Sequence, residues 1–139
     1  MTTPAAVPLI GWCGTLANAA AMRAAGLDCI EAQLVPMKLD DDDAFADAKA
    51  RVRELPLPAL AMSYLFPHDV RIVGPGSDER RNRAYFDRVV ELLALAKSRI
   101  VVLGQAQAEA EFLAALCWCA DALQGSGTTL VIEPLNRKE

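Results

Sequence analysis

The chain has 139 residues, of which 53% are hydrophobic and 23% are charged, and its formal net charge is −4. This length suits one compact domain, and the apolar content excludes an intrinsically disordered chain. Arg residues concentrate only in ERRNRAYFDR (79–88). Acidic residues are mixed into that stretch, so we interpret it as a solvent-exposed helix face and expect no nucleic-acid partner.

Short apolar runs alternate with helical patterns along the chain. The runs that we expect to form strands are 7–14, 27–36, 56–66, 99–105 and 129–134. The helices expected between them are 16–26, a segment from the acidic run at 40–43 to Arg53, a long segment starting at 77–79, and 108–123. Alternation of this kind predicts a parallel sheet with right-handed crossovers.

The ends and faces of these helices carry recognisable signals. Gly26 stands where a helix C-cap prefers glycine. The run DDDD (40–43) is better explained as a helix N-terminus than as a metal site, because carboxylates cap free N–H groups and complement the helix dipole. Apolar stripes are expected on the last two helices, at Phe86, Val89, Val90 and Leu93 and at Phe112, Leu113, Leu116 and Ala120.

The absence of two nucleotide-binding motifs from the sequence narrows the choice of fold class. Neither G-x-G-x-x-G nor G-x-x-x-x-G-K-[ST] occurs in the sequence, so the two nucleotide-binding fingerprints of open α/β sheets are missing. The remaining common solution is a (β/α) barrel of TIM type, whose chemistry lies where the strands end. Eight such units need about 250 residues. We therefore expect a partial barrel of about five parallel strands with four intervening helices.

The cysteines and the hydropathy pattern bear on location. Residues 1–10 lack the basic start and apolar core of a signal peptide, and no apolar run reaches the roughly 20 residues of a membrane span. We expect a cytoplasmic protein with free thiols and no membrane partner. Cys117 and Cys119 stand two apart on an expected helix and do not share a face, so a metal or redox role is not expected of them.

Four segments resemble the xylose isomerase-like TIM barrels, the sugar phosphate isomerase/epimerase superfamily. They are WCG (12–14), CIEAQL (29–34), HDVRIVGPGSDERRNRAYFDR (68–88) and, most specifically, EPLNRKE (133–139). The superfamily includes ketose 3-epimerases, hydroxypyruvate isomerase, inosose dehydratase and metal-dependent apurinic endonucleases. The resemblance covers residues 1–139 as the N-terminal portion of such a barrel, its first five strands.

The resemblance implies a sugar or sugar-phosphate isomerase or epimerase that acts by metal-assisted proton transfer next to a carbonyl. Glu133 matches the residue that ligates a divalent metal and serves as acid/base, and Glu139, Asn136 and Arg137 match the part that approaches the substrate. The metal of a complete site would be Mn, Mg, Co or Zn. The family's other ligands, an Asp, a His and a second Glu, come from strands six to eight, so we expect an incomplete site that by itself holds a metal weakly or not at all.

Each candidate residue also has a plainer interpretation. Glu133 or Glu31, at the ends of the fifth and second strands, could instead be paired with a nearby cation. His68, the single histidine, is a candidate substrate contact or an ordinary surface residue. Trp12 and Cys13 end the first strand, where packing in the core or in a pocket wall is expected.

Two other functions stay open. The chain could be a non-catalytic truncated half-barrel that folds only with a partner half, including a homo-oligomer formed through the exposed edges of the sheet. A relationship to the metal-dependent apurinic endonucleases ranks last, because those enzymes use several metal-ligating histidines and this sequence has one.

Overall fold

The computed structural model describes residues 8–105 and 110–134. The strands are β1 (Gly11–Gly14), β2 (Cys29–Gln33), β3 (Ala59–Ser63), β4 (Ile100–Gln105) and β5 (Thr129–Pro134). The α-helices are α1 (Ala19–Ala24), α2 (Asp42–Arg53), α3 (Glu79–Ala96) and α4 (Ala110–Ala122). Two 3-10 helices, η1 (Leu16–Asn18) and η2 (Val35–Met37), follow β1 and β2. The predicted alternation of strands and helices is confirmed.

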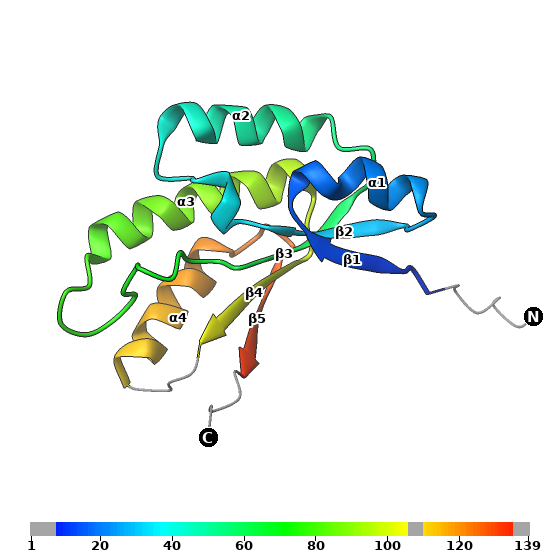
Figure 1. The fold of residues 1–139 in the computed structure, drawn as a ribbon. Helices are drawn as coiled ribbons and strands as arrows, with labels where there is room; N and C mark the ends of the chain where they lie inside the picture. Colours follow the sequence, from blue (N-terminus) through cyan, green and yellow to red (C-terminus); the bar gives the residue numbers. More distant parts are fainter. Residues whose placement is uncertain (1–7, 106–109, 135–139) are drawn as a thin grey trace, which may run out of the picture.

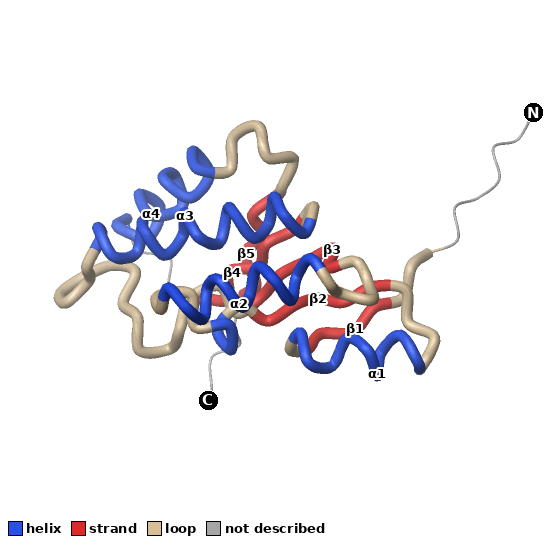
Figure 2. The backbone as a smooth tube through the Cα atoms, turned by 90° about the horizontal axis from the view of Figure 1, so that it is seen from above, coloured by secondary structure: helices blue, strands red, loops and turns tan. Residues whose placement is uncertain are grey.

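The five strands form one parallel sheet in which the order in space is the order in the chain. Each helix connects one strand to the next strand in the sheet by a right-handed crossover, always in the same direction. This places every helix on the same face of the sheet. Figures 1 and 2 show α1 to α4 together on one face of the twisted sheet. This is the arrangement of a (β/α) barrel that is open, and a doubly wound sheet would carry helices on both faces. The predicted fold class, a partial barrel of TIM type, is confirmed.

Residues alternate between the two faces of the sheet, as the pleat of a strand requires. Ile30, Met62 and Val101 are 1%, 0% and 0% exposed, and the helical layer covers this face. Glu31 occupies the register position beside Cys13 on β1 and beside Ala61 on β3, so these residues share the opposite face. The side chains at the ends of the strands on that face are therefore free to build a site.

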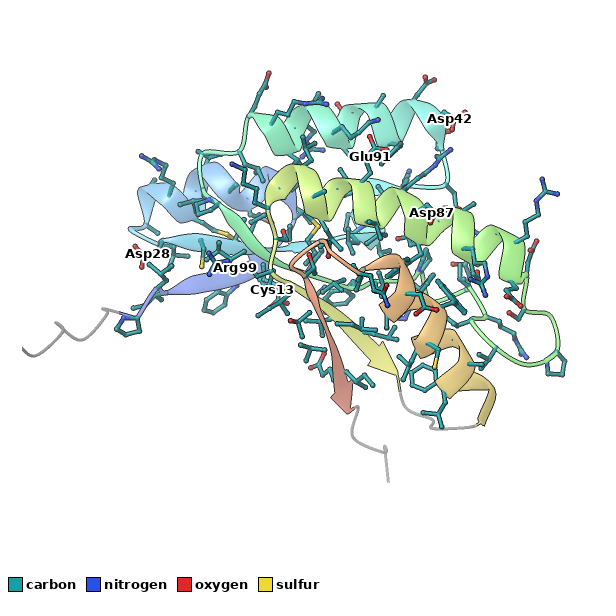
Figure 3. The ribbon with its side chains drawn as sticks, turned by 180° about the vertical axis from the view of Figure 1, so that it is seen from behind. Cys13, Asp28, Asp42, Asp87, Glu91 and Arg99 are labelled. Atoms are coloured by element: carbon teal, nitrogen blue, oxygen red, sulfur yellow. The ribbon has the colours of Figure 1, made fainter. Side chains whose placement is uncertain are left out.

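The helix N-termini follow the sequence signals. Asp41 caps α2, because its Oδ1 accepts a hydrogen bond of 2.8 Å from the amide of Ala44. Asp40 and Asp42 of the same acidic run pair with Arg81 and Arg88 of α3. In Figure 3, Asp42, Asp87 and Glu91 lie in the helical layer, whereas Cys13 lies on the sheet. The interpretation of DDDD as a helix N-terminus is confirmed.

The expectations about the stretch 79–88 and the first strand are confirmed only in part. Arg80 and Arg83 are exposed as expected of a solvent-exposed helix face, but Asn82 between them is 1% exposed. The first strand is shorter than the apolar run: β1 begins at Gly11, because the amide of Ile10 donates to the Asp28 carboxylate at 2.9 Å.

The apolar face expected on α4 is also partly wrong. Phe112 is buried and Leu116 is half-buried, but Leu113 is 59% exposed and Ala120 is exposed. The buried stripe instead comprises Phe112, Ala115, Cys119 and Leu123. Cys117 is exposed and Cys119 is buried, so the expectation that the two thiols face apart is confirmed. On α3, Phe86, Val89 and Leu93 are fully buried as predicted, and Val90 is half-buried.

The two outer strands leave apolar side chains uncovered. Within residues 8–105 and 110–134, β1 pairs only with β2, and β5 pairs only with β4. Trp12 on β1 is 68% exposed and Ile132 on β5 is 45% exposed, both on the helix-bearing face. No helix of the described residues is long and apolar enough to cross a membrane.

Candidate functional site

A cleft of about 650 Å³ lies on the helix-free face, at the carboxyl ends of the strands. All five strands or the turns that follow them contribute to its lining, through Cys13, Glu31, Ser63, His68, Gly104 and Glu133 among others. The carboxyl ends of parallel strands meet at one edge, so the topology alone brings residues up to 120 positions apart in the chain into one cavity. This is where barrel enzymes carry out their chemistry.

The cleft gathers three of the predicted site residues. Glu31, His68 and Glu133 line it together. Glu139, Asn136 and Arg137 lie outside the described residues. Cys13 lines the cleft, so the expected pocket-wall position is confirmed for this residue. It is wrong for Trp12, which is level with Ile30 in the sheet and therefore points to the opposite face, at an edge where no described helix covers it.

The two glutamates are not used in ion pairs of the described part of the chain. Glu133 is exposed and Glu31 is half-buried, and neither takes part in any of the salt bridges between described residues. Gly104, beside Glu133 in the register of β4 and β5, presents no side chain, which leaves the carboxylate open to the cavity. Among the described residues neither carboxylate has a cationic partner, so within this part of the chain both are available for a ligand.

A polar contact network forms the wall of the cleft between β1, β2 and β3. The Cys13 thiol lies 3.6 Å from Ser63 Oγ, and Gln33 Nε2 donates to the same sulfur at 3.6 Å. Ser63 is 5% exposed, and it is buried by these neighbours. Sequence reasoning missed Gln33 and Ser63. The signal that could have found them is the strand alternation, which puts both on the face of Glu31 at the end of their strands.

The loop after β3 is held in place by one buried amide. Asn82 Nδ2 of α3 donates to the Arg71 carbonyl at 2.9 Å, and the Ser77 hydroxyl donates to the Ile72 carbonyl at 2.8 Å. The segment 64–68, which carries His68 into the cleft, immediately precedes this clamp. Asn82 therefore positions one side of the cleft without contacting it, and the sequence offered no sign of this role among the surrounding arginines.

The described residues do not by themselves make a metal centre. No group of three or more His, Cys, Asp or Glu side chains able to hold an ion occurs within 8–105 and 110–134. Catalytic metal ions take three or more protein ligands, and Glu133 is one carboxylate at the edge of an open cavity. The donor chemistry suits a hard divalent ion, but the number of donors falls short.

Comparison with known proteins places the fold. Neither a protein-family model nor a curated protein sequence matches the chain. Solved structures do: D-allulose 3-epimerase from Methylomonas sp. superposes with a TM-score of 0.67 at 19% identity over 95% of this chain and 54% of that one. 3-Keto-D-glucoside 4-epimerase from E. coli superposes with a TM-score of 0.63 at 19% identity, over 94% of this chain and 57% of that one. The IOLI protein with a bound zinc atom superposes with a TM-score of 0.60 at 15% identity, over 89% of this chain and 51% of that one.

The chain thus spans between 51% and 57% of the length of these structures. Two of them are sugar epimerases, and one contains zinc. The resemblance suggested by the strand-end motifs is confirmed at the level of the fold. The chain has the fold of about half of the (β/α) barrels seen in these structures.

Proposed function

We propose that this chain supplies part of the site of a sugar or sugar-phosphate isomerase or epimerase, in which a proton moves next to a carbonyl. The observation that carries the proposal is the convergence of Glu133, Glu31 and His68 on one cleft at the carboxyl ends of the strands. These groups can accept or donate protons and hydrogen bonds to a polyol. The epimerases of the same fold support the substrate class.

Glu133 is the proposed base. Its carboxylate takes a proton from the carbon next to the carbonyl, the C–H electron pair becomes a C=C bond, and the carbonyl oxygen takes the negative charge. The epimer forms when water or a second acid returns a proton to that carbon from the opposite face and the carbonyl re-forms. The isomer forms when the charged oxygen takes a proton, the hydroxyl on that carbon loses its proton as the C=O bond forms there, and a proton is added to the former carbonyl carbon. Glu31 and His68 line the same cleft and are proposed to hydrogen-bond substrate hydroxyls, and Glu139 and Asn136 are further proposed contacts.

A divalent metal ion, when bound in a completed site, would stabilise the charge on that oxygen. Glu133 is its proposed ligand in this chain. Further ligands are expected from outside the described residues, because these contain no group of three or more His, Cys, Asp or Glu side chains that could hold an ion. The proposed substrates include phosphorylated as well as free sugars, and the proposed location of the protein is the cytoplasm.

Deuterium exchange tests the reaction. The chain is incubated in D₂O with D-allulose or D-fructose and Mn²⁺, and proton NMR follows loss of the signal at the carbon beside the carbonyl. We expect exchange that falls at least a hundredfold in Glu133→Gln, consistent with the loss of a general base. Glu54→Gln, at the exposed C-terminus of α2, is the matched control and should exchange like wild type. Equal exchange in wild type and Glu133→Gln would refute the role of Glu133.

A second candidate is a non-catalytic half-barrel that folds only with a partner half. The free edges of β1 and β5 and the exposed Trp12, Ile132 and Leu113 favour it, because unpaired strand edges with apolar side chains promote association. Light scattering on the purified chain should then show a dimer or larger species, which Trp12→Lys should dissociate. A well-folded monomer that catalyses the exchange would contradict this candidate.

A further inference from the structure

Tyr64, directly after β3, has an unusual backbone conformation. Its φ is +53°, in the left-handed region that L-residues with bulky side chains rarely adopt. Two other non-glycine residues of the described chain share this conformation, Lys38 and Lys97. Both are C-caps, of η2 and α3, where a left-handed residue is an ordinary way to end a helix. Tyr64 follows a strand and has no such explanation.

The surrounding chain explains why a turn is needed at this position. The Ser63 carbonyl accepts a hydrogen bond of 2.9 Å from the Leu34 amide, so the pairing of β3 with β2 persists up to Ser63. Leu65 is 1% exposed, and the Phe66 ring lies 5.4 Å from the Tyr85 ring, so the next residues enter the core at once. The reversal must therefore occur at residue 64, and glycine or asparagine would accomplish it with less strain.

The tyrosine side chain gains little from folding in return. It is 50% exposed, whereas Leu65 next to it is buried. The turn does place Tyr64 in the lining of the cleft with Glu31, His68 and Glu133. Strain that burial does not offset, at the end of a strand and inside a ligand-sized cavity, points to a functional role for the side chain.

We propose that Tyr64 is a sugar-contacting residue whose ring stacks on the C–H face of the substrate; this rests on the proposed function. The face of an aromatic ring is electron-rich and attracts the polarised C–H groups of a carbohydrate, and a rigid ring loses little entropy when it is covered. The cleft thus combines two aromatic residues, Tyr64 and Phe66, with several polar residues, the composition typical of small-molecule sites.

Substitutions that separate strain from binding test the proposal. Tyr64→Gly removes both the strain and the ring, and Tyr64→Phe retains the ring without its hydroxyl. Lys97→Gly is the matched control, because it relieves the same left-handed strain at φ +55°, on a helix C-cap that contributes nothing to the cleft lining. Binding of D-allulose to the metal-free chain is measured by saturation-transfer NMR, and Tm by thermal unfolding.

We expect both glycine variants to unfold at or up to about 3 °C above the wild-type Tm. D-Allulose affinity should fall about tenfold in Tyr64→Gly and stay within about twofold of wild type in Tyr64→Phe and Lys97→Gly. A fall in the Tm of Tyr64→Gly beyond 3 °C, unchanged affinity in this variant, or a wild-type chain that does not bind D-allulose would each overturn the inference. Failure of the proposed catalysis gives a different result: D-allulose still binds, but the Mn²⁺-dependent deuterium exchange is missing.

Discussion

Replacing Asn82 by alanine should release the loop after β3. Asn82 is 1% exposed and its Nδ2 donates to the Arg71 carbonyl at 2.9 Å. Loss of a buried donor that leaves its acceptor unpaired costs about 1–3 kcal/mol, so we take about 2 kcal/mol as the expected loss of unfolding free energy. Unfolding entropy of about 2.1 cal/mol/K per residue gives roughly 0.3 kcal/mol/K for 139 residues, and Tm should fall by about 7 °C.

The local consequence distinguishes a clamp from a general packing residue. Amide hydrogen exchange in Asn82→Ala should accelerate within residues 68–77 beyond the change seen in β2 and β4. Gln124→Ala, an exposed amide with no side-chain hydrogen bond to a described residue, is the control and should shift Tm by less than about 1 °C. A Tm change in Asn82→Ala below about 2 °C, or acceleration spread evenly over the sheet, would refute the clamp.

Two further predictions concern the helical layer. Arg88→Ala should lower the free energy of unfolding by about 1–2 kcal/mol in urea titrations, because the half-buried guanidinium joins α3 to the Leu39 carbonyl at 2.7 Å. Arg51→Ala is the control and should change this free energy by less than about 0.5 kcal/mol, because Arg51 makes only an exposed ion pair on α2. Burial raises the pKa of the Cys119 thiol to about 12, so at pH 8 iodoacetamide should label the exposed Cys117 and leave Cys119 intact. Equal labelling of the two thiols would contradict the burial of Cys119. The raised pKa means that the folded state retains this proton to higher pH than the unfolded state does, so the free energy of unfolding should decline as pH rises above about 9. The decline should be smaller in Cys119→Ala.

Much of the architecture was predictable because it rests on local pattern. Apolar runs separated by amphipathic stretches lead to a parallel sheet, and the stretch TLVIEP coincides with β5. The position of Glu31 and Glu133 on one face followed from strand ends and alternation, which need no tertiary information. Their exposure did not follow, because the sequence says nothing of which neighbours surround a strand end.

The failures have tertiary causes. The helix α4 is rich in Ala, Leu, Cys and Trp on most sides, so its periodicity could not choose between the stripe with Leu113 and the stripe with Cys119. Contacts of α4 with α3 and the sheet determine which of these stripes is buried. Asn82 lies among arginines and reads as a surface residue until the loop folds back over it. The left-handed turn at Tyr64 is set by the need to bury Leu65, and propensity disfavours it.

We propose that the strand ends of this half-barrel, with Glu133 among them, form one ligand site. Paramagnetic broadening by Mn²⁺ in NMR spectra of the labelled chain is the decisive measurement, since it detects weak binding even where ligands are few. We expect the resonances of Glu31, His68 and Glu133 to broaden together, and Glu133→Gln to abolish the effect. Broadening centred instead on the acidic run at 40–43, and unchanged in Glu133→Gln, would contradict it.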